Sequence, residues 1–133
     1  MEGVAYSIAN CFDAIQDIAT AKGERIGSLR IGRGGGSRLA HWRQMIADVL
    51  ALPLDVVGVE EPGCLGAALL AGVGVGVYPD MASAVGQTVH VQDRVVPDPD
   101  VTTAYGPLRA RFNQAYRALE PILYSQVNGE MKG

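Results

Sequence analysis

Apolar residues recur at helical spacing in the first half of the sequence. Between residues 3 and 21 the apolar positions are Ala5, Ile8, Phe12, Ile15 and Ala19, and Gly23 follows as a stop signal. Between residues 39 and 50 they are Leu39, Trp42, Met45, Ile46, Val49 and Leu50. Ser37 precedes the second set, so we expect its side chain to be the N-cap of that helix.

The longest regular stripe of apolar residues lies near the C-terminus. It follows the run Pro97-Asp98-Pro99-Asp100, which indicates a boundary and a helix start. Its members are Val101, Ala104, Tyr105, Leu108, Phe112, Ala115, Tyr116, Leu119 and Ile122. The stripe runs for only about three heptads, so it predicts a helix that packs on the domain and not a coiled coil. We expect residues 128–133 to be a disordered tail.

Short apolar runs bounded by glycine or proline predict two strands, at residues 26–31 and 54–59. Pro62 then suits the first turn of a third helix, at about residues 63–71, which is apolar nearly all round and is expected to pack tightly against a sheet. Asp80 is the expected cap of a short helical turn, and a brief extended piece is expected at residues 88–91.

The predicted order is helix, strand, helix, strand, helix and an appended C-terminal helix. Such alternation is typical of α/β proteins, in which right-handed crossovers join parallel strands. A sheet of only two strands is not stable alone in water. The pattern therefore predicts part of an α/β domain, with few parallel strands and flanking helices.

Three consecutive glycines, Gly34, Gly35 and Gly36, separate the first predicted strand from the second predicted helix. A turn without side chains lets a flat or charged ligand lie against the backbone. The unpaired N–H groups and positive dipole end of the following helix would face the same place. The turn therefore has two interpretations, a nucleotide site or a tight connection, and the segment alone favours neither.

Composition describes one soluble globular domain of 133 residues, with 48% hydrophobic residues, 19% charged residues and a net charge of −3. This balance argues against nucleic acid or a membrane surface as the main partner. Cys11 and Cys64 form no disulfide framework, so we expect buried free thiols in a reducing cytosol and a cytoplasmic location. No signal peptide is visible, and the apolar run at residues 64–78 is shorter than the roughly 20 residues of a membrane span.

Other chemistry finds weaker support. Gly32 and Gly34 match the first two glycines of a dinucleotide-binding fingerprint, but the third glycine would fall at Ser37. Glu60 and Glu61 follow at about the sequence spacing of the acidic residue that binds ribose in such sites, so a redox-cofactor site stays an alternative. No P-loop occurs, and neither histidine has a metal ligand at suitable spacing. The acidic residues that could serve as a base are better explained as helix-face or loop charges; they are Asp48, Asp55, Glu60 and Glu61.

Several motifs of the central region occur together in a known order. The glycine triplet is followed by Trp42-Arg43-Gln44, by Ala47-Asp48, by the run Glu61 to Ala68, and by Ala71-Gly72-Val73-Gly74. In this order and spacing the sequence resembles the C-terminal domain of the FGGY carbohydrate kinases, most of all the xylulokinase branch. The resemblance covers roughly residues 3–123.

The resemblance implies a partial actin-like, ribonuclease H-like ATPase domain, with residues 1–127 as the C-terminal half of the kinase's C-terminal domain. By the same resemblance, Gly34, Gly35, Gly36 and Ser37 would line the adenine and ribose side of an ATP site. Many members have Ser or Asn at the position of Leu39, so an apolar contact to adenine is what remains there.

In the full-length enzyme, the resemblance implies transfer of the γ-phosphoryl of ATP, with Mg²⁺, to a pentulose such as D-xylulose. The catalytic base and the sugar-binding residues of the family belong to an N-terminal domain, so this chain alone is expected to be inactive. The alternative hypothesis is a non-catalytic association module that pairs through an open sheet edge and the apolar third helix. A homodimer is expected.

Overall fold

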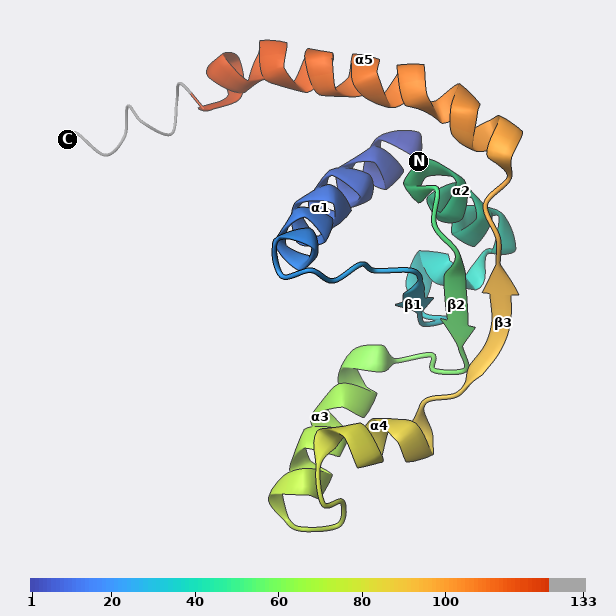
Figure 1. Ribbon diagram of the computed structural model, residues 1–133, viewed down its shortest axis with the longest axis vertical. Helices are drawn as coiled ribbons and strands as arrows, with labels where there is room; N and C mark the ends of the chain where they lie inside the picture. The colour runs from blue at the N-terminus through green and yellow to red at the C-terminus, as the bar shows by residue number, and fades with distance from the viewer. Residues whose placement is uncertain (125–133) are drawn as a thin grey trace, which may run out of the picture.

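The structure is a computed structural model that describes residues 1–124 (Figure 1). The predicted tail at 128–133 and the predicted boundary at 127 lie outside these residues. The elements are α1 (Glu2–Ala21), β1 (Leu29–Ile31), the 3₁₀ helix η1 (Gly35–Arg38), α2 (Ala40–Leu50), β2 (Leu54–Val57), α3 (Pro62–Gly74), α4 (Met81–Thr88), β3 (Val91–Val95) and α5 (Pro99–Tyr124). This order confirms the predicted mixed α/β class.

The described sheet has three strands in the order β1-β2-β3. β1 and β2 are parallel, with Leu29 opposite Leu54, as predicted. β3 is antiparallel to β2, with Val95 opposite Leu54. This strand was not predicted as a third strand of the sheet, and it runs antiparallel because α3 leads the chain away from the end of β2 and α4 leads it back to the same end (Figure 1). The predicted extended piece at 88–91 was too early, since the strand begins at Val91.

The core lies between α1, α2 and the sheet. Its fully or nearly buried members are Ala5, Tyr6, Ala9, Trp42, Ile46, Ala47, Val49 and Leu54. α5 crosses the outside of α1 and α2 (Figure 1), and the ring of Tyr6 contacts Phe112 at 5.4 Å and Tyr105 at 6.1 Å between centroids. The apolar periods of these helices thus mark the faces that meet, as the sequence pattern predicts.

α3 departs from its prediction. Leu69 is its one buried residue, while Leu70 is 63% exposed. α3 lies against α4, and the pair projects from the end of the sheet (Figure 1). The expected tight packing against a sheet is therefore wrong for this helix. The expected burial of both thiols is wrong as well, because Cys11 and Cys64 are free and exposed.

Polar contacts fix α5 onto the rest of the fold. Arg109 donates hydrogen bonds to Asn10 and forms an ion pair with Asp13 of α1. The backbone N–H of Asp98 donates to Asp48 Oδ1 over 2.8 Å, which holds the start of α5 against α2. Among the described helices, none combines the length and the hydropathy that crossing a bilayer requires.

Candidate functional site

The carboxyl ends of β1 and β2 bring two loops together. The first loop joins β1 to α2 and contains the three consecutive glycines, and the second joins β2 to α3. The backbone N–H of Arg33 donates to the carbonyl oxygen of Val59 over 2.8 Å. A Cβ on Gly34 would collide with the carbonyl oxygen of Glu60, so only glycine allows this approach. In α/β sheets, ligands bind at this edge, beyond the carboxyl ends of parallel strands.

The glycine turn has a defined conformation. Gly35 has φ +52°, a left-handed value that favours glycine, and it begins the 3₁₀ helix η1. The N–H of Ser37 donates to the carbonyl of Gly34, and the N–H of Leu39 donates to that of Gly36, each over 3.1 Å. α2 begins only at Ala40 with Leu39 as its N-cap. The expected cap by Ser37 is therefore wrong, because η1 uses Ser37 in a turn of its own.

The five residues predicted to line a nucleotide site lie together on this single turn. Gly35 and Gly36 are exposed, Gly34 and Ser37 are half-buried, and Leu39 is 58% exposed. No neighbouring atom lies within 4 Å of where a Cβ on Gly35 would stand. The turn is therefore open to solvent and is not covered by other described residues.

Trp42 and Arg43, which belong to a motif that was not assigned a role from the sequence, lie directly behind the turn. Trp42 lies against Gly36, whose Cβ position is 3.6 Å from its indole nitrogen. Arg43 is 6% exposed, and its Nη1 donates to the carbonyl oxygens of Ser37 at 2.7 Å and Arg38 at 3.1 Å. The signal for Arg43 is a charged residue within the apolar face of α2.

Three arginines and two glutamates lie at this edge, on or beside the two loops: Arg33, Arg38, Arg43, Glu60 and Glu61. Arg38 Nη2 lies 3.4 Å from Glu60 Oε2, but both side chains are well exposed, so this pair contributes roughly 0–1 kcal/mol. Arg33 reaches Gln92, and Arg43 adds a third positive charge nearby. The amino ends of α2 and α3 follow the two loops, and helix amino ends favour negative charge. The arrangement suits an anion or a nucleotide.

Two of the acidic residues considered as a possible base, Asp48 and Asp55, have structural partners. Asp48 accepts hydrogen bonds from Gln44 and from the backbone of Asp98. Asp55 accepts from Ser28 over 2.8 Å and lies 3.5 Å from Arg94. Within residues 1–124 no group of three or more His, Cys, Asp or Glu side chains could hold a metal ion.

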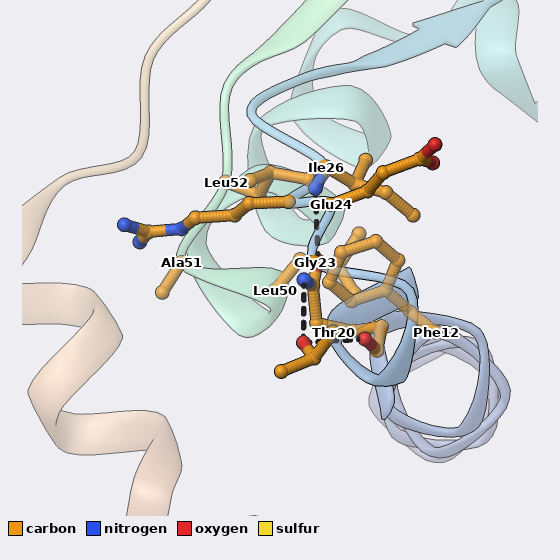
Figure 2. A pocket seen from close by; sticks show the side chains of 10 residues that line it. Phe12, Thr20, Gly23, Glu24, Ile26, Leu50, Ala51 and Leu52 are labelled. Atoms are coloured by element: carbon orange, nitrogen blue, oxygen red, sulfur yellow. Dashed lines mark hydrogen bonds between the residues drawn. The ribbon is translucent and has the colours of Figure 1, made fainter. Parts of the chain in front are cut away.

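A cavity of about 580 Å³ lies at the opposite end of the strands from the glycine turn (Figure 2). Its walls come from the end of α1, the segment before β1 and the turn between α2 and β2. In Figure 2, Ile26 and Leu52 lie near each other at the top of the view, with Leu50 and Phe12 below them. These walls adjoin the amino ends of β1 and β2, so the cavity is remote from the glycine turn.

Comparison with known proteins gives the family. Residues 1–75 match the C-terminal domain of the FGGY family of carbohydrate kinases. An autoinducer-2 kinase from Salmonella paratyphi A is 36% identical over 103 residues, which is 77% of this chain and 19% of the relative. The chain thus spans about a fifth of the length of such curated relatives.

Solved structures agree with this assignment. A xylulose kinase from Brucella ovis superposes with a TM-score of 0.70 at 26% identity, covering 91% of this chain and 24% of the kinase. A gluconate kinase from Lactobacillus acidophilus gives the same TM-score at 22% identity, over 89% of this chain and 23% of that protein, and supports the fold alone. The fold is that of the actin-like ATPase domain of FGGY sugar kinases. This chain belongs to the FGGY family of carbohydrate kinases, as part of their C-terminal domain.

Proposed function

We propose that this chain supplies the adenine-nucleotide side of the ATP site of an FGGY sugar kinase. One observation carries the proposal: in a chain of this family, the exposed turn at Gly35 and Gly36 lies at the carboxyl edge of β1 and β2, beside the amino ends of α2 and α3. Backbone N–H groups and helix dipoles at such an edge favour a phosphate-bearing ligand.

The turn offers distinct contacts to the two halves of adenosine. The bare surface of Gly35 and Gly36 admits a flat ring, and the exposed side chain of Leu39 supplies an apolar contact to adenine. In the proposed site, Gly34 and Ser37 would line the ribose side, and the backbone of the turn could approach the α-phosphate. The open turn therefore fits an adenine nucleotide, and within residues 1–124 no group of three or more His, Cys, Asp or Glu side chains could hold a metal ion.

In the complete kinase, we expect the γ-phosphoryl group of ATP to pass to the hydroxyl of a small sugar, with D-xylulose as the first substrate to test. Similarity to the xylulose kinase of Brucella ovis supports this choice of substrate. Because other relatives are autoinducer-2 kinases, autoinducer-2 should be tested beside D-xylulose. Phosphoryl transfer needs the base, the metal and the nucleotide in position together. We therefore propose a cytoplasmic kinase of which this chain alone, mixed with ATP and D-xylulose, forms no sugar phosphate.

Calorimetry with ADP on the 133-residue chain tests the nucleotide site. Wild-type protein is expected to bind, and Gly35→Val to lose binding, because a β-branched residue is strained at φ +52°. Gly23→Val is the matched control, since it places the same residue at another left-handed glycine, with φ +76°, remote from the glycine turn. The absence of NMR shift changes at residues 34–39 on addition of ADP would count against the site.

A second candidate function is association with another copy of this chain. An apolar groove of about 380 Å³ runs along α1, where Val4, Ile15 and Cys11 lie beside β1. Val4 and Ile15 are each more than half exposed there. Within the described sheet, the outer edge of β1 also has no partner strand.

Sedimentation over a range of concentrations tests this association. We expect a homodimer in which the α1 groove is covered. The variant Ile15→Glu should shift this dimer toward monomer, because burying a carboxylate without a counter-charge is unfavourable. Glu24→Gln is a matched surface control outside the groove. A well-folded monomer at all concentrations excludes the second candidate and leaves the nucleotide site unaffected.

A further inference from the structure

Arg43 is a buried cation directly behind the glycine turn. Its side chain comes from α2, and the residue is 6% exposed. Nη1 donates to two consecutive carbonyl oxygens of the turn, those of Ser37 and Arg38. A guanidinium stays charged at every physiological pH, so this positive charge is permanent. The turn therefore encloses a fixed cation on its inner side.

The charge of Arg43 has no acidic partner among the described residues. Its Nε is buried without a hydrogen-bond partner, and no described carboxylate lies within ion-pair distance. Arg109 differs from Arg43 in both respects, since its side chain is more exposed and forms an ion pair with Asp13. A buried charge without a counter-charge is unfavourable for folding, and an apolar side chain of similar size would avoid that cost.

We propose that Arg43 is a positioning residue of the nucleotide site, which shapes the turn and supplies the counter-charge for a nucleoside di- or triphosphate. This inference rests on the proposed nucleotide site. The single nitrogen Nη1 of Arg43 holds the carbonyl oxygens of Ser37 and Arg38 inward, and so fixes the turn that faces the ligand. Its uncompensated charge acts through the protein interior, where screening by water is weak.

The two parts of the inference predict different effects on ADP and on adenosine. Both ligands need the shape of the turn, but only ADP carries phosphates that the charge attracts. Calorimetry on the 133-residue chain is expected to show that Arg43→Gln weakens ADP binding about tenfold and adenosine binding about threefold or less. Arg43→Lys keeps the charge but has no nitrogen at the position where Nη1 bonds the two carbonyl oxygens. Both affinities are therefore expected to fall by a similar factor, and their ratio to stay unchanged.

Arg111→Gln removes the same type of charge from an exposed position on α5 and is the matched control. The inference is overturned if Arg43→Gln keeps the wild-type ratio of ADP to adenosine affinity. If Arg43→Gln does not fold, Arg43→Lys decides: weaker binding of both ligands at an unchanged ratio supports the inference, and wild-type affinities overturn it. Wild-type protein that binds neither ligand overturns the proposed function itself, a result distinct from a failure at Arg43.

Discussion

The backbone nitrogen of Arg33 lies 2.8 Å from the carbonyl oxygen of Val59, to which it donates a hydrogen bond. Both residues stand just beyond the carboxyl ends of their strands, so the bond continues the pairing of β1 with β2 into the following loops. This bond ties the glycine turn to the loop that carries Glu60. Local changes in either loop are expected to disturb both.

Gly34→Ala is expected to destabilise the fold by about 1–3 kcal/mol, the usual range for inserting a methyl group into a well-packed site. The new Cβ would meet the backbone carbonyl of Glu60, which cannot rotate aside as a side chain can. Relief of the clash requires the two loops to separate, at the expense of the bond between Arg33 and Val59. Urea unfolding followed by the fluorescence of Trp42 measures the loss.

Gly36→Ala is the matched control for that substitution. Its Cβ would stand 3.6 Å from the ring of Trp42, an ordinary contact distance, and Gly36 does not have a positive φ. The free energy of unfolding should therefore change by less than about 0.5 kcal/mol. Equal losses for the two variants would show that the close approach at Gly34 is not what the turn requires.

Leu39→Ser is expected to stabilise the protein by about 0.5–1 kcal/mol. Leu39 is the N-cap of α2, with φ −79° and ψ 117°, and its side chain makes no capping hydrogen bond. A serine hydroxyl at this position can accept from an unpaired N–H of the first turn. Because Leu39 is 58% exposed, little apolar burial is lost. Leu39→Ala lacks the hydroxyl and should show no gain in the same urea titration.

The sequence pattern was sufficient for the parts of the fold whose apolar faces meet inside this chain. Periodicity located α1, α2 and α5, and short apolar runs located the pair β1 and β2. The glycine triplet marked the turn, and proximity in sequence placed its five residues together. The prediction of Ser37 as the N-cap was wrong because a 3₁₀ turn precedes the α-helix. The sequence pattern does not show that the 3₁₀ turn ends, and the α-helix begins, at Leu39.

The remaining features depend on contacts that a single pattern does not reveal. β3 reads Val-Gln-Asp-Arg-Val and is largely exposed, so it carries no buried apolar run. α3 is apolar nearly all round, a pattern that predicts a helix buried on every side. Its described contacts within this chain are nevertheless chiefly with α4, and most of its residues are exposed or half-buried. The contacts of Arg43 with the carbonyl oxygens of Ser37 and Arg38 depend on the conformation of the turn, which the sequence pattern does not specify.

The two free thiols give a prediction about the exposed surfaces. Cys11 lies in the α1 groove and Cys64 on α3, and both are exposed in the monomer. At low concentration both should react readily with a thiol reagent. If two copies associate through the α1 groove, the variant Cys64→Ser, which retains Cys11, should react more slowly as its concentration rises. Cys11→Ser, which retains Cys64, should react at a constant rate, and slowing in this variant alone would place the contact on α3.

α4 provides a prediction about pH. Asp80 caps this helix by accepting from the backbone N–H of Ser83 over 2.7 Å. Hydrogen bonds from Ser83 lower the pKa of the carboxyl group below its ordinary value of 3.8. The unfolded helix therefore binds this proton more readily than the folded one, and the contribution of Asp80 to stability rises with pH.

The contribution is complete above pH 3.8 and is lost as the pH falls through the lower pKa of the folded state. NMR chemical shifts of residues 81–88 in the wild-type chain should accordingly report loss of helix in this acid range. Asp80→Asn keeps a capping oxygen without the titration, so its shifts should be flatter with pH, while Asp80→Ala should lower the helicity of α4 already at neutral pH. An acid profile of Asp80→Asn that matches the wild type would assign the transition to other carboxyl groups.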